Sequence, residues 1–139
     1  MIDDFIKRFT GKKFNHIKLR NEYYLVHPKL LELKKKIPLE PASMGIFLGK
    51  QAGKRFLPSI ELIKMLALHS DKKVYVNDKA AWLFVCKRDV FEKSILKKKV
   101  SKGLCLVMNS KDECLGYGEL SSRGIKNILD IGEYLRMER

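Results

Sequence analysis

Apolar and polar residues in the first part of the chain follow two different periods. Residues 3–9 place apolar side chains at helical spacing, whereas residues 16–20 alternate between apolar and polar side chains as a strand does. A second strand-like segment, residues 23–26, follows after only Asn21 and Glu22, so we expect the two strands to pair as a hairpin. The pattern predicts a short helix followed by two antiparallel strands.

Two prolines delimit a second predicted helix. Pro28 suits its first turn and Pro38 stops it, with three leucines between them. Residues 34–36 are lysines, which suit the negative end of the helix dipole. We interpret this lysine run as a solvated helix end rather than as a binding site.

A glycine- and lysine-rich segment follows this helix. Residues 44–48 are typical of a buried strand and residues 49–55 of a loop, and residues 56–57 form a further short strand. Ser59 is placed to cap a helix over residues 60–68, whose apolar side chains recur at helical spacing.

The pattern changes after residue 71, where short strands separated by turns take over. Only residues 89–96 have helical character, and the polar residues 109–113 indicate a hairpin between two strands. Many short strands at this spacing favour a small barrel. We therefore expect an α+β fold, with a mixed α/β domain over residues 1–71 and a β pseudo-barrel over residues 72–139. The strands predicted in the second domain cover residues 73–76, 82–85, 104–108, 115–118 and 128–135.

Positive charge is spread along the whole chain. The 139 residues carry a formal net charge of +13, and Lys and Arg exceed Asp and Glu by 14 to 7 before residue 72 and by 15 to 9 after it. An excess of this size on a folded protein attracts polyanions, of which nucleic acid is the commonest. The alternative is a basic protein whose charge serves only solubility.

The cysteine pattern and the first residues bear on location. Cys86, Cys105 and Cys114 are an odd number without CxxC spacing, and we interpret them as buried, reduced thiols in strands. The acidic start of the chain is unlike a signal peptide, and no apolar run is long enough to span a membrane. A cytoplasmic protein without membrane association is expected.

No enzyme signature emerges from the motifs. The segment Gly45–Lys50 is one residue short of a phosphate-binding GxxxxGK loop, and Gln51 stands where that loop needs Ser or Thr. The three histidines are more than ten residues apart, and none stands near a cysteine at metal-ligand spacing. We expect no catalysis, no cofactor and no metal, although residues scattered along the chain could still form an active site.

Three segments together resemble one family. Gly45–Lys50 with the following Gly53–Phe56 looks like the Gly-Lys segment of the Nip-seven family of large-subunit ribosome-biogenesis factors. Leu104–Gly118 is similar to the central hairpin of that family's PUA domain, and Asp130–Arg136 matches its closing motif. The resemblance extends over residues 14–136. The closing motif is typical of PUA domains in general, whereas the Gly-Lys segment points to this family.

The resemblance implies an N-terminal α/β domain, a C-terminal PUA-type β pseudo-barrel and a monomer that binds rRNA or pre-rRNA with other ribosome-assembly proteins. It implies no catalysis, and a nucleolar location if the source is eukaryotic. Two alternatives remain open: an accessory subunit of an RNA-modifying enzyme, and an enzyme with a scattered active site.

The candidate RNA-binding residues surround the predicted helix of the second domain. Two cations begin that helix and three follow its end. The stretch of residues 121–130 is shorter than in the family and leaves two basic residues to contact RNA. A guanidinium group can bind a phosphate through two parallel hydrogen bonds, whereas the ammonium of a lysine acts as a point charge. The candidates are Lys87, Arg88, Lys97, Lys98, Lys99, Arg123 and Lys126.

Glycines and aromatic residues in this region have structural interpretations. We interpret Gly116 and Gly118 as positions where a strand bends or another backbone comes close, rather than as RNA contacts. Tyr23, Tyr24 and Trp82 could stack on bases. At their spacings, however, we expect each of them to pack inside the protein.

Overall fold

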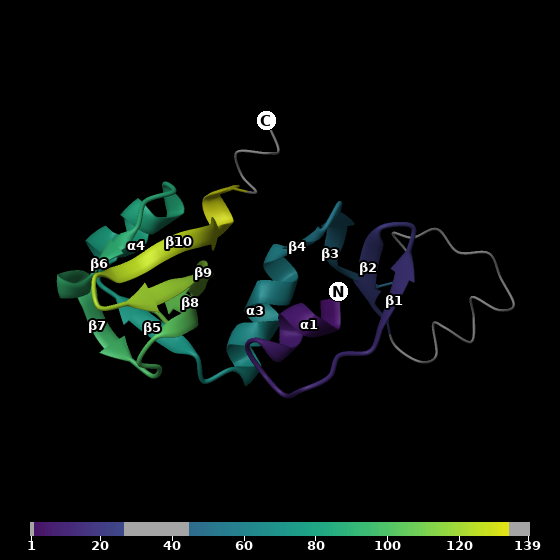
Figure 1. Cartoon of the computed structure of the whole chain (residues 1–139), viewed down its shortest axis with the longest axis horizontal. Coiled ribbons are helices and arrows are strands. Elements are labelled where there is room, and N and C mark those ends of the chain that lie inside the picture. The colour runs from purple at the N-terminus through teal and green to yellow at the C-terminus, as the bar shows by residue number, and fades with distance from the viewer. Residues whose placement is uncertain (1, 27–44, 134–139) are drawn as a thin grey trace, which may run out of the picture. The chain divides into compact units, whose positions relative to one another are not determined.

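The structure, a computed structural model, describes residues 2–26 and 45–133. The chain divides into two compact units, residues 1–65 and residues 66–139 (Figure 1). The domain boundary predicted from the sequence lies after residue 71. The boundary between the two compact units lies six residues earlier, within a helix that spans residues 60–69. The helix predicted between Pro28 and Pro38 lies outside the described residues.

The N-terminal unit contains a four-stranded antiparallel sheet in which strands adjacent in the chain are adjacent in space. The predicted hairpin at its start is confirmed, with Ile17 opposite Tyr24. Aromatic side chains from different elements meet in this unit, as Phe5 and Tyr23 do by each contacting Phe56. The elements are α1 (Ile2–Lys7), β1 (His16–Leu19), β2 (Glu22–Leu25), β3 (Ile46–Ala52), β4 (Arg55–Pro58) and α3 (Ile60–His69).

Helix α3 begins where the sequence predicted. The hydroxyl oxygen of Ser59 accepts a hydrogen bond from the main-chain N–H of Leu62 at 3.1 Å and donates one to the carbonyl of Phe47 at 2.7 Å. Leu62, Ile63 and Leu66 are fully buried along one side of the helix. The same serine therefore caps α3 and ties it to β3.

The glycine- and lysine-rich segment is mostly strand rather than the predicted loop. Strand β3 continues to Ala52, and only Gly53 and Lys54 form the turn to β4. Gly49 lies within the strand, where an added Cβ would stand 2.7 Å from the ring of Phe56 and 2.5 Å from a main-chain oxygen. Close packing by β4 therefore explains this glycine, and no helix follows the segment as a phosphate loop would require.

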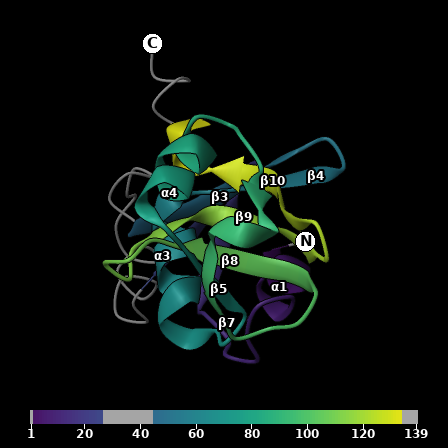
Figure 2. The ribbon, with the colours of Figure 1, turned by 90° about the vertical axis from the view of Figure 1, so that its left-hand side faces the viewer.

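The C-terminal unit is built on a curled six-stranded sheet in the order β6-β10-β9-β8-β5-β7 (Figure 1), and Figure 2 shows this unit facing the viewer. Strands β5 and β8 are parallel and all other neighbours antiparallel. The hairpin predicted around residues 109–113 is confirmed as β8 and β9. The elements are β5 (Lys73–Val76), α4 (Asp78–Val85), β6 (Val90–Phe91), η2 (Glu92–Ser94), β7 (Ile95–Lys98), β8 (Gly103–Met108), β9 (Cys114–Ser121) and β10 (Gly124–Asp130).

The strand predicted at residues 82–85 is wrong, because these residues form the second half of α4. The side chain of Asn77 caps this helix by accepting a hydrogen bond from the N–H of Ala80 at 2.8 Å. Phe84 is fully buried, whereas the side chain of Trp82 is 69% exposed, so the expectation that Trp82 packs inside is also wrong. In the described part of the chain, no helix combines the length and apolar character needed to cross a membrane.

The helix predicted at residues 89–96 is wrong as well. Val90 is buried and Phe91 exposed, which is the alternation of a strand, and both residues pair with β10. The carboxylate of Asp89 accepts a hydrogen bond from the main-chain N–H of Asn127 at 2.8 Å and so does not cap a helix. Only residues 92–94 form a single turn of 3₁₀ helix.

The last predicted strand, residues 128–135, is displaced. Strand β10 begins earlier, at Gly124, and ends at Asp130, after which residues 131–133 are helical. The carboxylate of Asp130 is fully buried and accepts a hydrogen bond from the N–H of Glu133 at 3.1 Å, which turns the chain out of the sheet. The remainder of the predicted strand lies outside the described residues.

The structural interpretation of the two glycines in β9 is confirmed. A Cβ added to Gly118 would lie 2.3 Å from the carbonyl oxygen of Lys126, and one added to Gly116 would lie 2.1 Å from that of Leu129. Strand β10 therefore passes too close to β9 for any side chain at these positions.

The three cysteines do not share one environment. Cys105 in β8 and Cys114 in β9 are buried, and burial raises the pKa of their thiols to about 12 and about 11. Cys86, which follows α4, is exposed, so the prediction of a buried strand residue is wrong for this cysteine. All three are free thiols.

Candidate nucleic-acid interface

Two strands far apart in the sequence create a hollow on the C-terminal unit. Phe91 lies opposite Gly124 in the pairing of β6 with β10, and the N–H of Glu92 donates to the carbonyl of Arg123 at 3.1 Å. The hollow at this edge has a volume of about 380 Å³. We call its lining the β6–β10 rim, which comprises residues 89–91, 121 and 123–126. The rim brings together Arg123 and Lys126, two of the predicted RNA-binding residues.

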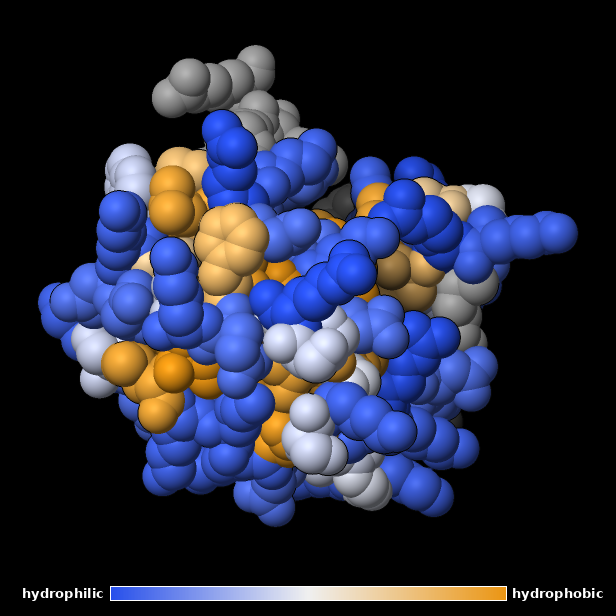
Figure 3. All heavy atoms as spheres, turned by 60° about the vertical axis from the view of Figure 1, so that its left-hand side comes forward, coloured by the Kyte–Doolittle hydropathy of each residue, from blue (hydrophilic) through white to orange (hydrophobic). Residues whose placement is uncertain are grey.

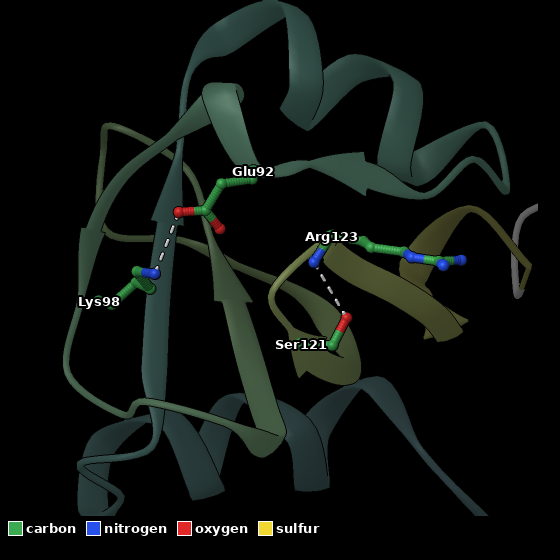
Figure 4. A network of polar contacts seen from close by, with 4 residues as sticks. All are labelled: Glu92, Lys98, Ser121 and Arg123. Atoms are coloured by element: carbon green, nitrogen blue, oxygen red, sulfur yellow. Dashed lines mark hydrogen bonds and ion pairs between the residues drawn. The ribbon is translucent and has the colours of Figure 1, made fainter.

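Arg123 is placed at the tip of the β9–β10 hairpin. Its main-chain N–H donates to the hydroxyl of Ser121 at 3.3 Å, which fixes the turn (Figure 4). Its guanidinium extends away from the neighbouring Glu92 and Lys98 (Figure 4). Within residues 2–26 and 45–133, no carboxylate pairs with the charged group of Arg123 or of Lys126. Both are therefore available to an anion such as a phosphate.

Lys98 already has a partner. Its ammonium lies 3.2 Å from the carboxylate of Glu92, with 38% and 48% of the two side chains exposed (Figure 4). An exposed pair of this kind contributes only about 0–1 kcal/mol to stability. Lys98 can exchange Glu92 for a phosphate, but Glu92 competes with the phosphate for it.

Of the lysine run at residues 97–99, the first two residues lie within strand β7 and the third just beyond it, and not after the end of a helix as expected. In β7, Lys97 lies opposite Tyr75 and Lys98 opposite Val74, so successive side chains project to opposite faces of the sheet. Lys99 lies just beyond the strand, with its N–H bonded to the carbonyl of Lys73. The three lysines are exposed, but they do not form one basic face.

Lys87 and Arg88 follow the end of α4 instead of beginning a helix. Lys87 adopts a left-handed conformation with φ of 71°, and its N–H donates to the carbonyl of Phe84. The N–H of Arg88 donates to the carbonyl of Leu83, which completes the usual two-bond termination of an α-helix. Both cations thus lie at the negative end of the α4 dipole, where they have a structural role.

Asn127 connects this helix end to β10. Its side-chain amide donates to the carbonyl of Phe84 at 2.9 Å and lies 3.4 Å from the carbonyl of Arg88. The main chain of Arg88 is thereby held beside the residue that follows Lys126. The structure brings Arg88 to the neighbourhood of the β6–β10 rim, along with Arg123 and Lys126.

The sequence interpretation missed several residues at this site. Phe91 lines the rim with 68% of its side chain exposed, and Lys93 and Glu92 line an adjoining hollow with Phe91 and Arg123. Figure 3 shows one face of the protein, on which small hydrophobic patches are separated by hydrophilic side chains. Reading Val90 and Phe91 as one inward and one outward strand position would have identified the exposed ring.

Comparison with known families agrees with this architecture. Residues 72–139 match the family model described as the UPF0113 PUA domain. A UPF0113 protein from Archaeoglobus fulgidus is 31% identical to the chain over 115 residues, which cover 73% of the chain and 66% of that relative. The chain thus spans 66% of the length of this curated relative.

A solved structure shares the fold. A conserved PUA domain protein from Thermoplasma acidophilum matches 98% of this chain and 91% of its own, with a TM-score of 0.59 and 17% identity. A hypothetical protein from Pyrococcus horikoshii OT3 matches 89% of this chain and 80% of its own, with a TM-score of 0.49 and 13% identity. The α+β fold with a C-terminal pseudo-barrel is confirmed. Residues 72–139 thus match a PUA family model and have the fold of a PUA domain, a type of domain that generally binds RNA.

Proposed function

We propose that this protein is a non-catalytic factor of large-subunit ribosome assembly, which holds unpaired segments of rRNA or pre-rRNA on the β6–β10 rim. The observation that carries the proposal is the convergence of Arg123 and Lys126 on one hollow, with Arg88 held beside them through Asn127. The ribosomal assignment rests on the resemblance of the Gly-Lys segment and the closing motif to the Nip-seven family.

The chemistry of the rim suits an RNA backbone. Two basic side chains without carboxylate partners in the described part of the chain can each take a phosphate, and the guanidinium of Arg123 can do so with two parallel hydrogen bonds. Phosphate contacts position RNA without reading its sequence, so reading is left to the edges and faces of unpaired bases. Single-stranded or looped RNA is therefore the expected ligand.

Glu92 opposes binding at the same place. Glu92 lines the hollow that Lys93 and Arg123 also line, and its carboxylate forms an ion pair with the ammonium of Lys98. Replacing it with glutamine removes a negative charge that repels phosphate and releases Lys98. Glu92→Gln should therefore bind RNA more tightly than the wild-type chain, whereas every loss of a cation at the rim should weaken binding.

The test compares two triple variants with the same change in net charge. Arg88→Ala, Arg123→Ala and Lys126→Ala are combined in one, and three exposed lysines that do not line the rim, Lys54, Lys64 and Lys111, are replaced with alanine in the other. Titration into labelled rRNA fragments, followed by fluorescence anisotropy, should give a loss of about tenfold to a hundredfold for the first variant only. All six side chains are exposed, so thermal melting should show both variants folded.

Equal losses in the two variants would show that net charge alone attracts RNA, and the rim would not be the site. The assembly role is tested separately by purifying the tagged chain from cells. Pre-ribosomal particles are the expected partner, whereas a single RNA-modifying enzyme would indicate an accessory subunit instead. Turnover of RNA by the purified chain would contradict the non-catalytic proposal.

A further inference from the structure

Phe91 is an aromatic side chain that the fold leaves uncovered. Strand alternation directs Val90 into the core, where it is 3% exposed, and turns Phe91 outward, where it is 68% exposed. The residue opposite Phe91 on β10 is Gly124, which has no side chain to lie across the ring. A Cβ at this glycine would stand 1.9 Å from the carbonyl oxygen of Val90, so the close approach of the strands requires glycine there.

The hollows beside the ring are lined by four cations, together with the carboxylates of Asp89 and Glu92. Phe91 lines the hollow of about 380 Å³ with Arg123 and Lys126, and it also lines a hollow of about 450 Å³ with Lys93 and Arg123. It lines a third, of about 400 Å³, with Lys79 on α4 and again Lys93.

This ring has no evident structural task. Among the described residues it makes no contact with another aromatic ring, unlike Phe56 in the N-terminal unit. An exposed apolar side chain contributes little of the stabilisation that a buried one provides. Trp82 is equally exposed on α4, but it does not line any of these three hollows. Among the aromatic residues that the structure describes, Phe91 alone lines these hollows, beside cations from α4, η2 and β10.

We propose that Phe91 is a stacking platform for one unpaired nucleobase of a single-stranded RNA, whose flanking phosphates are held by Arg123, Lys126 and Lys93. An aromatic face accepts any base, and a base can lie on it only when it is free of a partner strand. The proposal rests on the proposed function, and it adds a preference for bases over bare sugar-phosphate. The occupant is RNA because the cations around the ring match a polyanion, whereas an apolar protein surface would leave them unpaired.

The experiment separates stacking from charge. The full chain is titrated with a ten-nucleotide oligouridylate and with an abasic oligomer of the same length and phosphate number. The wild-type protein should bind the first on the order of tenfold more tightly. Phe91→Leu keeps an apolar side chain without the aromatic face, so it should bind both oligomers alike. Phe91→Tyr should restore the preference, and Trp82→Leu should leave it unchanged.

Each outcome decides between specific alternatives. If the wild type binds neither oligomer, RNA binding itself fails, and this inference fails with it. If the wild type binds both equally, or if Phe91→Leu retains the preference, the rim binds RNA by charge and Phe91 is not a platform. A preference lost in Trp82→Leu instead would place the stacking residue on α4. The exposure of Phe91 means that its variants should melt at the wild-type temperature.

Discussion

Lys87 illustrates how one residue can be constrained by the fold while its charge remains available. The left-handed backbone at φ of 71° completes the termination of α4, a position that usually carries glycine because a Cβ is strained there. The lysine gains from its place at the negative end of the helix dipole. The backbone strain and the electrostatic gain can be separated by substitution.

We predict that Lys87→Gly is more stable than Lys87→Ala by about 1 kcal/mol. Both variants lose the charge, but only glycine adopts the left-handed conformation without steric cost, and this outweighs its greater flexibility in the unfolded chain. Chemical denaturation of the two variants measures the difference. Equal stabilities would mean that the left-handed turn is not maintained in solution.

At the level of elements, one polar side chain links the end of α4 to β10, beside the hydrophobic core that the two elements share. Asn127 donates from its side-chain amide to the carbonyl of Phe84 and to the carboxylate of Asp130, and its main-chain N–H donates to Asp89. It stands immediately before an irregularity in the pairing of β10 with β9. The polar side chain therefore holds together a helix end, a loop and an interrupted strand.

Asn127→Ala should destabilise the protein by about 1–3 kcal/mol, because it removes one of the hydrogen bonds that the carbonyl of Phe84 and the buried carboxylate of Asp130 each accept. Lys126→Ala, the exposed neighbour in the same strand, is the control and should change stability by less than ~0.5 kcal/mol. Urea unfolding curves give both values. A loss for Asn127→Ala no greater than that of the control would contradict the assigned role.

Elements bounded by local signals could be predicted from the sequence. The hairpin around Asn21 and Glu22, the helix capped by Ser59 and the β8–β9 hairpin each carry a turn or cap within a few residues. The second half of α4 could not be assigned in this way, because residues 82–85 are a continuous apolar run that suits a buried strand or a helix equally. The signal that decides it, the cap at Asn77, was not recognised.

The candidate site was predictable only in part, for a different physical reason. Basic residues are visible in a sequence, but the pairing of β6 with β10 that joins Phe91 to Arg123 connects segments far apart in the chain. Local periodicity holds no information about such pairing. It likewise could not show that Glu92 lies beside Lys98, or that β7 directs Lys97 and Lys98 to opposite faces.

At the scale of the whole molecule, which carries a net charge of +13, the number of phosphates that the protein neutralises sets how RNA binding responds to salt. If ~4–5 phosphates are neutralised, log affinity for single-stranded RNA should fall with log salt at a slope of about −3 to −3.5. Removing Arg88, Arg123 and Lys126 together should make the slope shallower by about 2. Titrations at several potassium chloride concentrations measure both slopes. A wild-type slope near zero would contradict an electrostatic mode of binding.

The position of β5 in its sheet has a consequence for how the barrel forms. This strand comes first in the sheet's chain order, yet its partners are β7 and β8, with Val74 opposite both Lys98 and Val107. Strands β8, β9 and β10 are joined by short turns and can pair as soon as they meet. Strand β5 can pair only after the long segment that separates it from β7 and β8, which contains α4, folds back on itself. The entropy of that closure is lost before any contact compensates for it, so the pairing of β5 with β8 and the equally distant pairing of β6 with β10 should limit the rate at which this unit folds. During synthesis, β5 leaves the ribosome with an apolar face and no partner strand until β7 is complete at Lys98, and without its parallel neighbour β8 until the chain reaches Met108.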